Sequence, residues 1–105
     1  MKKKTYKQFF HGKGISKRDS GSKTMRWFPN TYVDTYNTQT GKFRARRKYG
    51  KDGWAYKDMD TADNHRPYDH IHDIENCKRS STPREPDKRE KKELRKAKKK
   101  RRFLK

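Results

Sequence analysis

The fold is decided by residues 24–60, TMRWFPNTYVDTYNTQTGKFRARRKYGKDGWAYKDMD. Four short runs rich in aromatic and β-branched residues, at 24–28, 31–37, 42–49 and 54–60, are separated by Pro-Asn, Thr-Gln-Thr-Gly and Gly-Lys-Asp-Gly. Short runs bounded by turn-forming residues are the signal for strands joined as hairpins. Connections of about four residues suit antiparallel neighbours. We therefore expect an antiparallel β-meander of three or four strands.

Alternation along the third run assigns its side chains to two faces, because successive residues of a strand point in opposite directions. Phe43, Ala45 and Tyr49 form an aromatic face. The opposite face presents a basic group made of Arg44 and Arg46, with Arg47 and Lys48 nearby. These four residues are candidates for contacting phosphate, and the alternative interpretation is a solvated strand face.

The flanks of this meander are strongly basic. The chain of 105 residues has 32 Lys and Arg against 13 Asp and Glu, a net charge of +19 and a pI near 10.3. Such a charge predicts a polyanionic partner, RNA or DNA or a ribonucleoprotein, because bases that neutralise phosphates release counterions. The alternative is that lysines only keep the domain soluble. No apolar run is long enough to span a bilayer, so we expect a cytoplasmic protein with no membrane partner.

Only 26% of the residues are apolar, so the core must be small, although an aromatic content of 12% argues against disorder throughout. We expect residues 1–23 to be a flexible basic arm and residues 24–79 to be one small β-rich domain. Residues 80–105 have a helical composition, with Thr82 as a capping residue or, because of Pro86, a later start. Its apolar stripe is thin, so we expect a solvated basic helix, and the class is α+β. Its candidate nucleic-acid contacts are Arg95, Lys99, Arg101 and Arg102.

Residues 57–77, KDMDTADNHRPYDHIHDIENC, form an acidic island at the expected edge of the sheet, with six acids against two bases. The island holds three of the four histidines and the only cysteine. His70 and His72 would lie on one side of an extended segment. With His65 and Cys77 they provide the nitrogen and sulfur donors that zinc favours, and Asp69 and Asp73 could orient the imidazoles. A closed zinc site would also support a small core.

Two alternative interpretations of the island remain. The first is acid–base catalysis of phosphodiester cleavage, with His65, His70 and His72 as proton-transfer groups and Arg66 or an arginine of 44–47 stabilising the developing charge. A metal-dependent form would hold magnesium on Asp58, Asp60 or Asp69. The second alternative is a set of turn residues and exposed histidines whose acids pair with the basic flanks.

The order of residues over about 44–74 resembles the type 24 domain of bacterial polymorphic toxins. The matching positions are Arg47, Tyr49, Gly53, Ala55, Asp58, Asp60, Asp63, His65, Pro67, His70 and His72. This resemblance implies a small β-rich fold, with a site made of the three acids and three histidines in that list. The chain is also similar in size and style to short basic phage and prophage proteins and to anti-CRISPR proteins, some of which bind zinc. That similarity implies a nucleic-acid-targeting partner such as a CRISPR effector.

Three functional hypotheses follow. The first is a mobile-element protein that binds nucleic acid or a ribonucleoprotein and holds zinc through histidine and cysteine. The alternative is a toxin-like nuclease that uses the island histidines. The third is a metal-free protein held to a host partner by charge.

Overall fold

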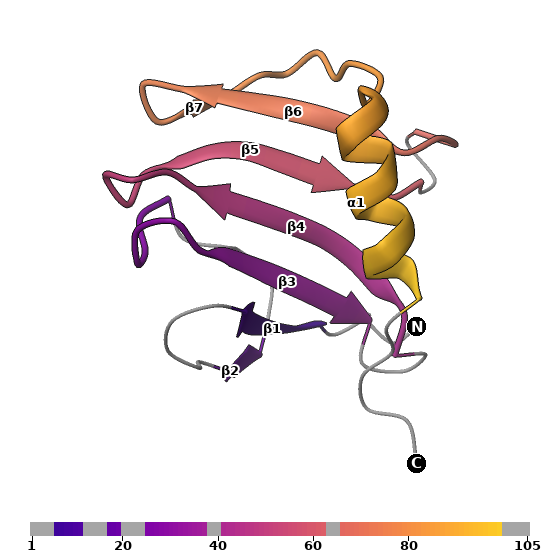
Figure 1. Ribbon diagram of the computed structural model, residues 1–105, viewed down its shortest axis with the longest axis horizontal. Helices are drawn as coiled ribbons and strands as arrows, with labels where there is room; N and C mark the ends of the chain where they lie inside the picture. The colour runs from indigo at the N-terminus through magenta and orange to yellow at the C-terminus, as the bar shows by residue number, and fades with distance from the viewer. Residues whose placement is uncertain (1–5, 12–16, 20–24, 38–40, 63–65, 100–105) are drawn as a thin grey trace, which may run out of the picture.

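The computed structural model describes residues 6–11, 17–19, 25–37, 41–62 and 66–99, with side chains over 25–36, 41–62 and 66–99. Within these residues, seven strands form one antiparallel sheet in the order β2-β1-β3-β4-β5-β6-β7, and helix α1 (Lys88–Lys98) lies across one face of it (Figure 1). The α+β class is confirmed. In the part of the chain that the structure describes, no helix is long and apolar enough to cross a membrane.

The predicted meander is confirmed for its last three runs. They form β3 (Tyr32–Asn37), β4 (Phe43–Tyr49) and β5 (Ala55–Asp60). The chain continues into β6 (His70–Glu75) and β7 (Lys78–Arg79), so five successive strands make a meander. The His/Asp segment is therefore not the edge of the sheet, because β6 is paired on both sides.

The first predicted run is not a strand over its described residues, 25–28. It forms an isolated bridge between Arg26 and Trp54, flanked by hydrogen bonds from the Trp27 N–H to the Gly53 carbonyl at 2.9 Å and from the Ala55 N–H to the Met25 carbonyl at 2.8 Å. Asn30 has a φ of 56°, which turns the chain before β3 begins. Gly53, at a φ of 83°, permits this contact, because a side chain there would meet the Trp27 carbonyl oxygen at 2.7 Å.

Two further strands lie within residues 1–23, which the sequence assigned to a flexible arm. They are β1 (Tyr6–His11) and β2 (Lys17–Asp19), and β1 pairs with β3 over its whole length. β1 also pairs with β2, but each β3 residue that it pairs with is more than twenty residues away in sequence, so local turn signals could not reveal the pairing with β3.

A β-bulge divides the aromatic face predicted for β4. Thr35 pairs with Ala45 and Tyr36 pairs with Phe43, so β4 has one extra residue, Arg44, at this point. Phe43 and Ala45 therefore lie on opposite faces. Phe43 joins the buried cluster under α1, with Tyr36, Met59, Ile71, Leu94 and Ala97. A second cluster of Val33, Tyr49, Ala55 and Ile74 lies on the other face, where Met25 and Trp27 pack against it.

The helix starts later and is buried more than the sequence predicted. Asp87 is the N-cap and forms a capping box with Glu90, because Pro86 keeps the preceding segment extended. Leu94 and Ala97 are each only 2% exposed. The thin stripe is sufficient because the sheet supplies the rest of the apolar contact, so α1 is part of the domain rather than a solvated tail.

Candidate metal centre and basic face

Three potential metal ligands meet on the face of the sheet opposite α1. Asp60 ends β5, and His70 and His72 alternate along β6, with Asp60 paired directly to His70. One ligand atom from each residue lies within 4.8 Å of the others. The histidine rings are 5.1 Å apart between centroids. The prediction that His70 and His72 share a face is confirmed, and strand register brings Asp60 to them.

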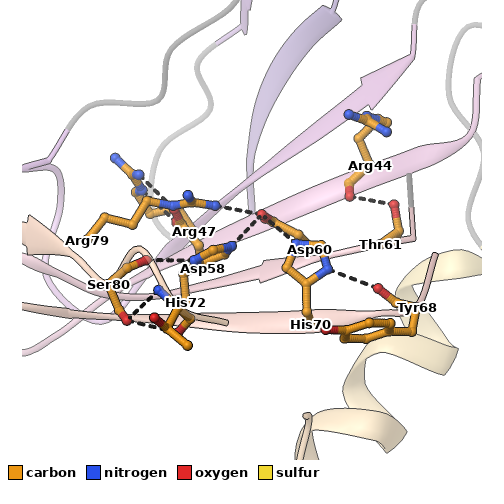
Figure 2. Close-up of polar contacts among 11 residues, drawn as sticks. Arg44, Arg47, Asp58, Asp60, Thr61, Tyr68, His70, His72, Arg79 and Ser80 are labelled. Atoms are coloured by element: carbon orange, nitrogen blue, oxygen red, sulfur yellow. Dashed lines mark hydrogen bonds and ion pairs between the residues drawn. The ribbon is translucent and has the colours of Figure 1, made fainter. Parts of the chain in front are cut away.

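Backbone carbonyls fix the orientation of both rings (Figure 2). The Nδ1 atom of His70 lies 2.9 Å from the Tyr68 carbonyl oxygen, and that of His72 lies 2.7 Å from the Ser80 carbonyl oxygen. A carbonyl oxygen only accepts hydrogen bonds, so both Nδ1 atoms must carry protons. In the neutral rings the lone pairs are then on Nε2. This contact is the usual means by which proteins orient metal-binding histidines.

Both Nε2 atoms face one carboxylate oxygen. Asp60 Oδ2 lies 3.5 Å from His70 Nε2 and 3.9 Å from His72 Nε2. Three acceptor atoms that face one another repel, and a cation among or beside them relieves that repulsion. Arg79 supplies one positive charge, because its Nη2 donates to the same Asp60 oxygen at 2.6 Å. The cluster thus has the donor set of a two-histidine, one-carboxylate metal site, with a guanidinium bound to its carboxylate.

The neighbouring carboxylate, Asp58, is occupied by arginines. Arg47 binds both of its oxygens, each at 2.7 Å, and the Arg79 Nε donates to it at 2.7 Å. Burial opposes the charge of Arg47, but the hydrogen bond and attraction from Asp58 outweigh burial and raise the pKa of Arg47. Asp58 therefore acts as the buried counter-ion of β4, and it anchors Arg79 beside Asp60.

The predicted histidine and cysteine zinc set is not supported. Cys77 is exposed and lies in the turn between β6 and β7, with a φ of 64°. It is not part of the cluster formed by Asp60, His70 and His72. His65 and Asp63 lie outside the described residues. Arg66 is half-buried in the segment before β6.

The two aspartates expected to orient the rings have other partners. Asp69 accepts from the Ala62 N–H at 3.0 Å and pairs with Lys98. Asp73 lies on the helix side of β6 and binds Arg84 at 2.7 Å, a contact that lowers the pKa of Asp73. Neither holds an imidazole, and backbone carbonyls take that role.

The arginines of β4 are not the exposed phosphate contacts that alternation suggested. Arg46 is 6% exposed and binds both oxygens of Asp34, at 2.7 and 2.9 Å, with Glu93 at 2.8 Å. Arg47 is similarly buried on Asp58. Lys48 is half-buried and contacts Glu93 at 3.0 Å, while Arg44 is half-buried at the bulge. Each buried arginine meets an aspartate on the neighbouring strand, a pairing that depends on register.

The basic surface lies instead on α1. Every exposed residue between positions 88 and 99 is a base: Lys88, Arg89, Lys91, Lys92, Arg95, Lys96, Lys98 and Lys99. We call these residues the basic face. Arg95 and Lys99 are among the contacts that the sequence predicted, whereas Arg101 and Arg102 lie outside the described residues.

The acids of α1 point toward the sheet and are neutralised there. Glu90 binds Arg84 at 2.8 Å and Lys57 at 2.6 Å. Burial alone would raise the pKa of Glu90, but these hydrogen bonds lower it to about 2. Glu93 contacts Arg46 and Lys48, and its pKa is also lowered despite burial. The helix thus separates its charges, with acids inward and bases outward.

Comparison with known proteins gives no relative: no family model, no curated protein and no solved structure matches the chain.

Proposed function

We propose that the chain is a nucleic-acid-binding protein that contacts phosphates through the basic face of α1 and holds one divalent metal ion, zinc first, between β5 and β6. The observation that carries the binding proposal is that all exposed side chains from 88 to 99 are Lys or Arg. Residues 88–99 carry eight bases and two acids, and because Glu90 and Glu93 contact bases of the sheet, only the bases of this segment are exposed. A surface such as the basic face, where Lys and Arg gather without exposed acids, is typical of proteins that bind phosphates.

The metal proposal is supported by the chemistry of Asp60, His70 and His72. Two imidazole nitrogens and one carboxylate oxygen suit zinc, which also accepts a water as its fourth ligand. His70 is only 3% exposed and His72 only 6%. Because a substrate would have little access to an ion between these rings, the burial favours a structural role for the metal over a catalytic one. Because its ligands come from adjacent strands, a bound ion would tie β5 to β6.

The binding proposal is tested by removing two outward charges from the helix. Lys88→Gln/Lys92→Gln should weaken binding to an oligonucleotide. It should also reduce the slope of log affinity against log salt by about 0.7–0.9 for each phosphate that the protein no longer neutralises. Lys51→Gln/Lys78→Gln, which removes the same charge from exposed positions outside the helix, is the matched control. Equal weakening in both variants, or affinity independent of salt, would contradict the proposal.

The metal proposal is tested by elemental analysis of protein purified without a histidine tag. About one zinc per chain is expected, and His72→Ala should lose it. Cys77→Ser is the control and should keep full occupancy, because its thiol is outside the cluster. Metal retained by the His72 variant, or absent from the Cys77 variant, would show that the ion binds elsewhere.

The nuclease hypothesis is the second candidate. It is favoured by one observation, that two imidazole Nε2 atoms and a guanidinium meet at Asp60. We rank it lower because a substrate phosphate would have to displace Arg79 to reach the buried rings. If the chain cleaves RNA or DNA, and a folded His70→Ala variant does not, the nuclease hypothesis becomes the first candidate. The mobile-element origin and the CRISPR effector partner stay predictions.

A further inference from the structure

A groove lies between the segment preceding β6 and one side of α1. Its volume is about 440 Å³, and its lining includes Tyr68, Pro86, Lys91, Arg95 and Lys98. The three bases are at positions i, i+4 and i+7 of the helix, so they form one row along its side. This row belongs to the basic face but borders a concave surface, whereas Lys88 and Lys92 do not line it.

The groove contains an exposed aromatic ring. Tyr68 is 47% exposed, and its ring contacts His70 edge-on at 6.1 Å between centroids. An exposed aromatic side chain next to Lys91 and Arg95 is the combination that single-stranded nucleic acid uses, because nucleobases stack on the ring and the phosphate backbone follows the positive charges. A groove of this volume suits a small group such as one nucleotide rather than a duplex.

The two acids in the lining reduce its positive charge, because one of them neutralises Lys98, and they leave Lys91 and Arg95 as the bases open to a phosphate. Asp69 is already paired with Lys98 and accepts the Ala62 N–H. Glu85, exposed at the rim, adds a carboxylate that can accept from an amino group on a base edge. The groove therefore combines a stacking surface, phosphate-binding charges and one polar group able to contact a base.

We propose that this groove binds single-stranded nucleic acid, with one base stacked on Tyr68 and adjacent phosphates on Lys91 and Arg95. The proposal rests on the proposed function. It adds that the nucleic acid is single-stranded and that Tyr68 is the residue that distinguishes a single strand from a duplex. Paired bases within a duplex have no face free to stack on a side chain, so duplex binding would use charge alone.

The test compares fluorescence anisotropy of labelled single-stranded DNA, single-stranded RNA and a duplex of equal length with the full chain. Tyr68→Ala should weaken single-strand binding about tenfold, since stacking contributes about 1–3 kcal/mol per base. It should leave duplex binding and the salt slope unchanged, because no charge is removed. Tyr68→Phe should bind normally. Tyr56→Ala, which removes a tyrosine of similar exposure from β5, should have no effect.

Tyr68→Leu keeps apolar bulk without an aromatic face and covers the case in which the alanine variant fails to fold. Weaker single-strand binding by this folded variant supports stacking. Equal affinity of the Leu variant and the unmodified chain, or equal effects on single strand and duplex, overturns the groove proposal while leaving phosphate binding intact. Absence of salt-dependent binding to every probe overturns both proposals.

Discussion

A single oxygen, Oδ2 of Asp60, determines what the ring cluster can do. It receives Arg79 and faces the Nε2 atoms of His70 and His72. Because backbone carbonyls hold both Nδ1 protons, the rings cannot turn to offer another atom without breaking those hydrogen bonds. Asp60 is therefore the position at which a metal ion and Arg79 compete.

This competition predicts the effect of Arg79→Gln. Removing the guanidinium should tighten zinc binding by about fivefold or more, because two cations a few ångströms apart in a partly screened site repel by roughly 1–4 kcal/mol. Asp58 keeps its bidentate contact with Arg47, so the fold should survive. Zinc affinity is measured by competition with a chelating dye.

Lys78→Gln is the matched control for that experiment, since it removes a base from the same short strand at an exposed position. Its zinc affinity should equal that of the unmodified chain. A ten- to hundredfold weaker affinity in the Arg79 variant would instead mean that Arg79 orients Asp60 for the metal.

The pH dependence of stability is predicted at Glu90. Its pKa falls from 4.5 to about 2 on folding, so its contribution is complete above pH 4.5 and is lost as the pH falls toward 2. A shift of this size corresponds to at most about 3 kcal/mol. Glu90→Gln, which keeps a capping side chain, should therefore be less stable by about that amount at pH 6 and nearly equal at pH 2.

Urea unfolding across this pH range measures the difference, with Glu85→Gln as an exposed control. A constant gap between the Glu90 variant and the unmodified chain would assign the destabilisation to packing rather than to charge.

The sequence predicted part of this site because some of its information is local. The two-residue spacing of His70 and His72 is sufficient to place them on one face of a strand. The third ligand depends on the register between β5 and β6, which the residue types do not encode. The chemistry of zinc favours Cys77, but a turn keeps its thiol away from the rings. The sequence indicates Asp60 only as one of several carboxylates that could hold a metal, and the cross-strand pairing with His70 is what singles it out.

At the scale of elements, β4 buries an arginine on each face. Arg46 meets Asp34 on the helix side, and Arg47 meets Asp58 on the other. The alternating pattern predicted the strand correctly, but it could not predict burial of these charges. Their counter-ions come from strands on both sides, and the bulge at Arg44 changes which residues share a face. Paired charges thus extend a core that apolar residues alone leave small.

The helix completes that core, which predicts the effect of Leu94→Ala. Leu94 is buried against the sheet, and truncating it should cost about 2–5 kcal/mol of unfolding free energy. Lys96→Ala, on the exposed side of the same helix, should change stability by no more than about 0.5 kcal/mol. Denaturant titration followed by tryptophan fluorescence measures both.

Deleting residues 80–105 should have a larger effect than Leu94→Ala. It would expose Tyr36, Met59 and Ile71 and remove the Ser80 carbonyl that holds His72. A cooperative melt that persists in this truncated chain would show that the sheet folds alone, as the sequence-based boundary at residue 79 implied.

For the whole molecule, charged residues stabilise the interior through buried ion pairs and destabilise the surface through repulsion. The buried pairs around Arg46 and Arg47 are shielded from dissolved ions, whereas 32 bases against 13 acids leave a strong repulsion over the surface. The fold therefore tolerates its surface charge and does not depend on it. Binding to phosphate, by contrast, depends on that same charge.

One titration with sodium chloride should separate these effects. Between about 50 and 500 mM salt, screening of surface repulsion should raise the melting temperature, and a gain of about 1 kcal/mol would appear as roughly 4–8 °C. Over the same range oligonucleotide affinity should fall steeply, because each phosphate contact loses its counterion-release advantage. Lys88→Gln/Lys92→Gln should show a smaller rise in melting temperature as well as a smaller fall in affinity. Melting temperature and affinity that fall together would mean instead that exposed ion pairs, such as Arg84 with Asp73, stabilise the fold more than surface repulsion opposes it.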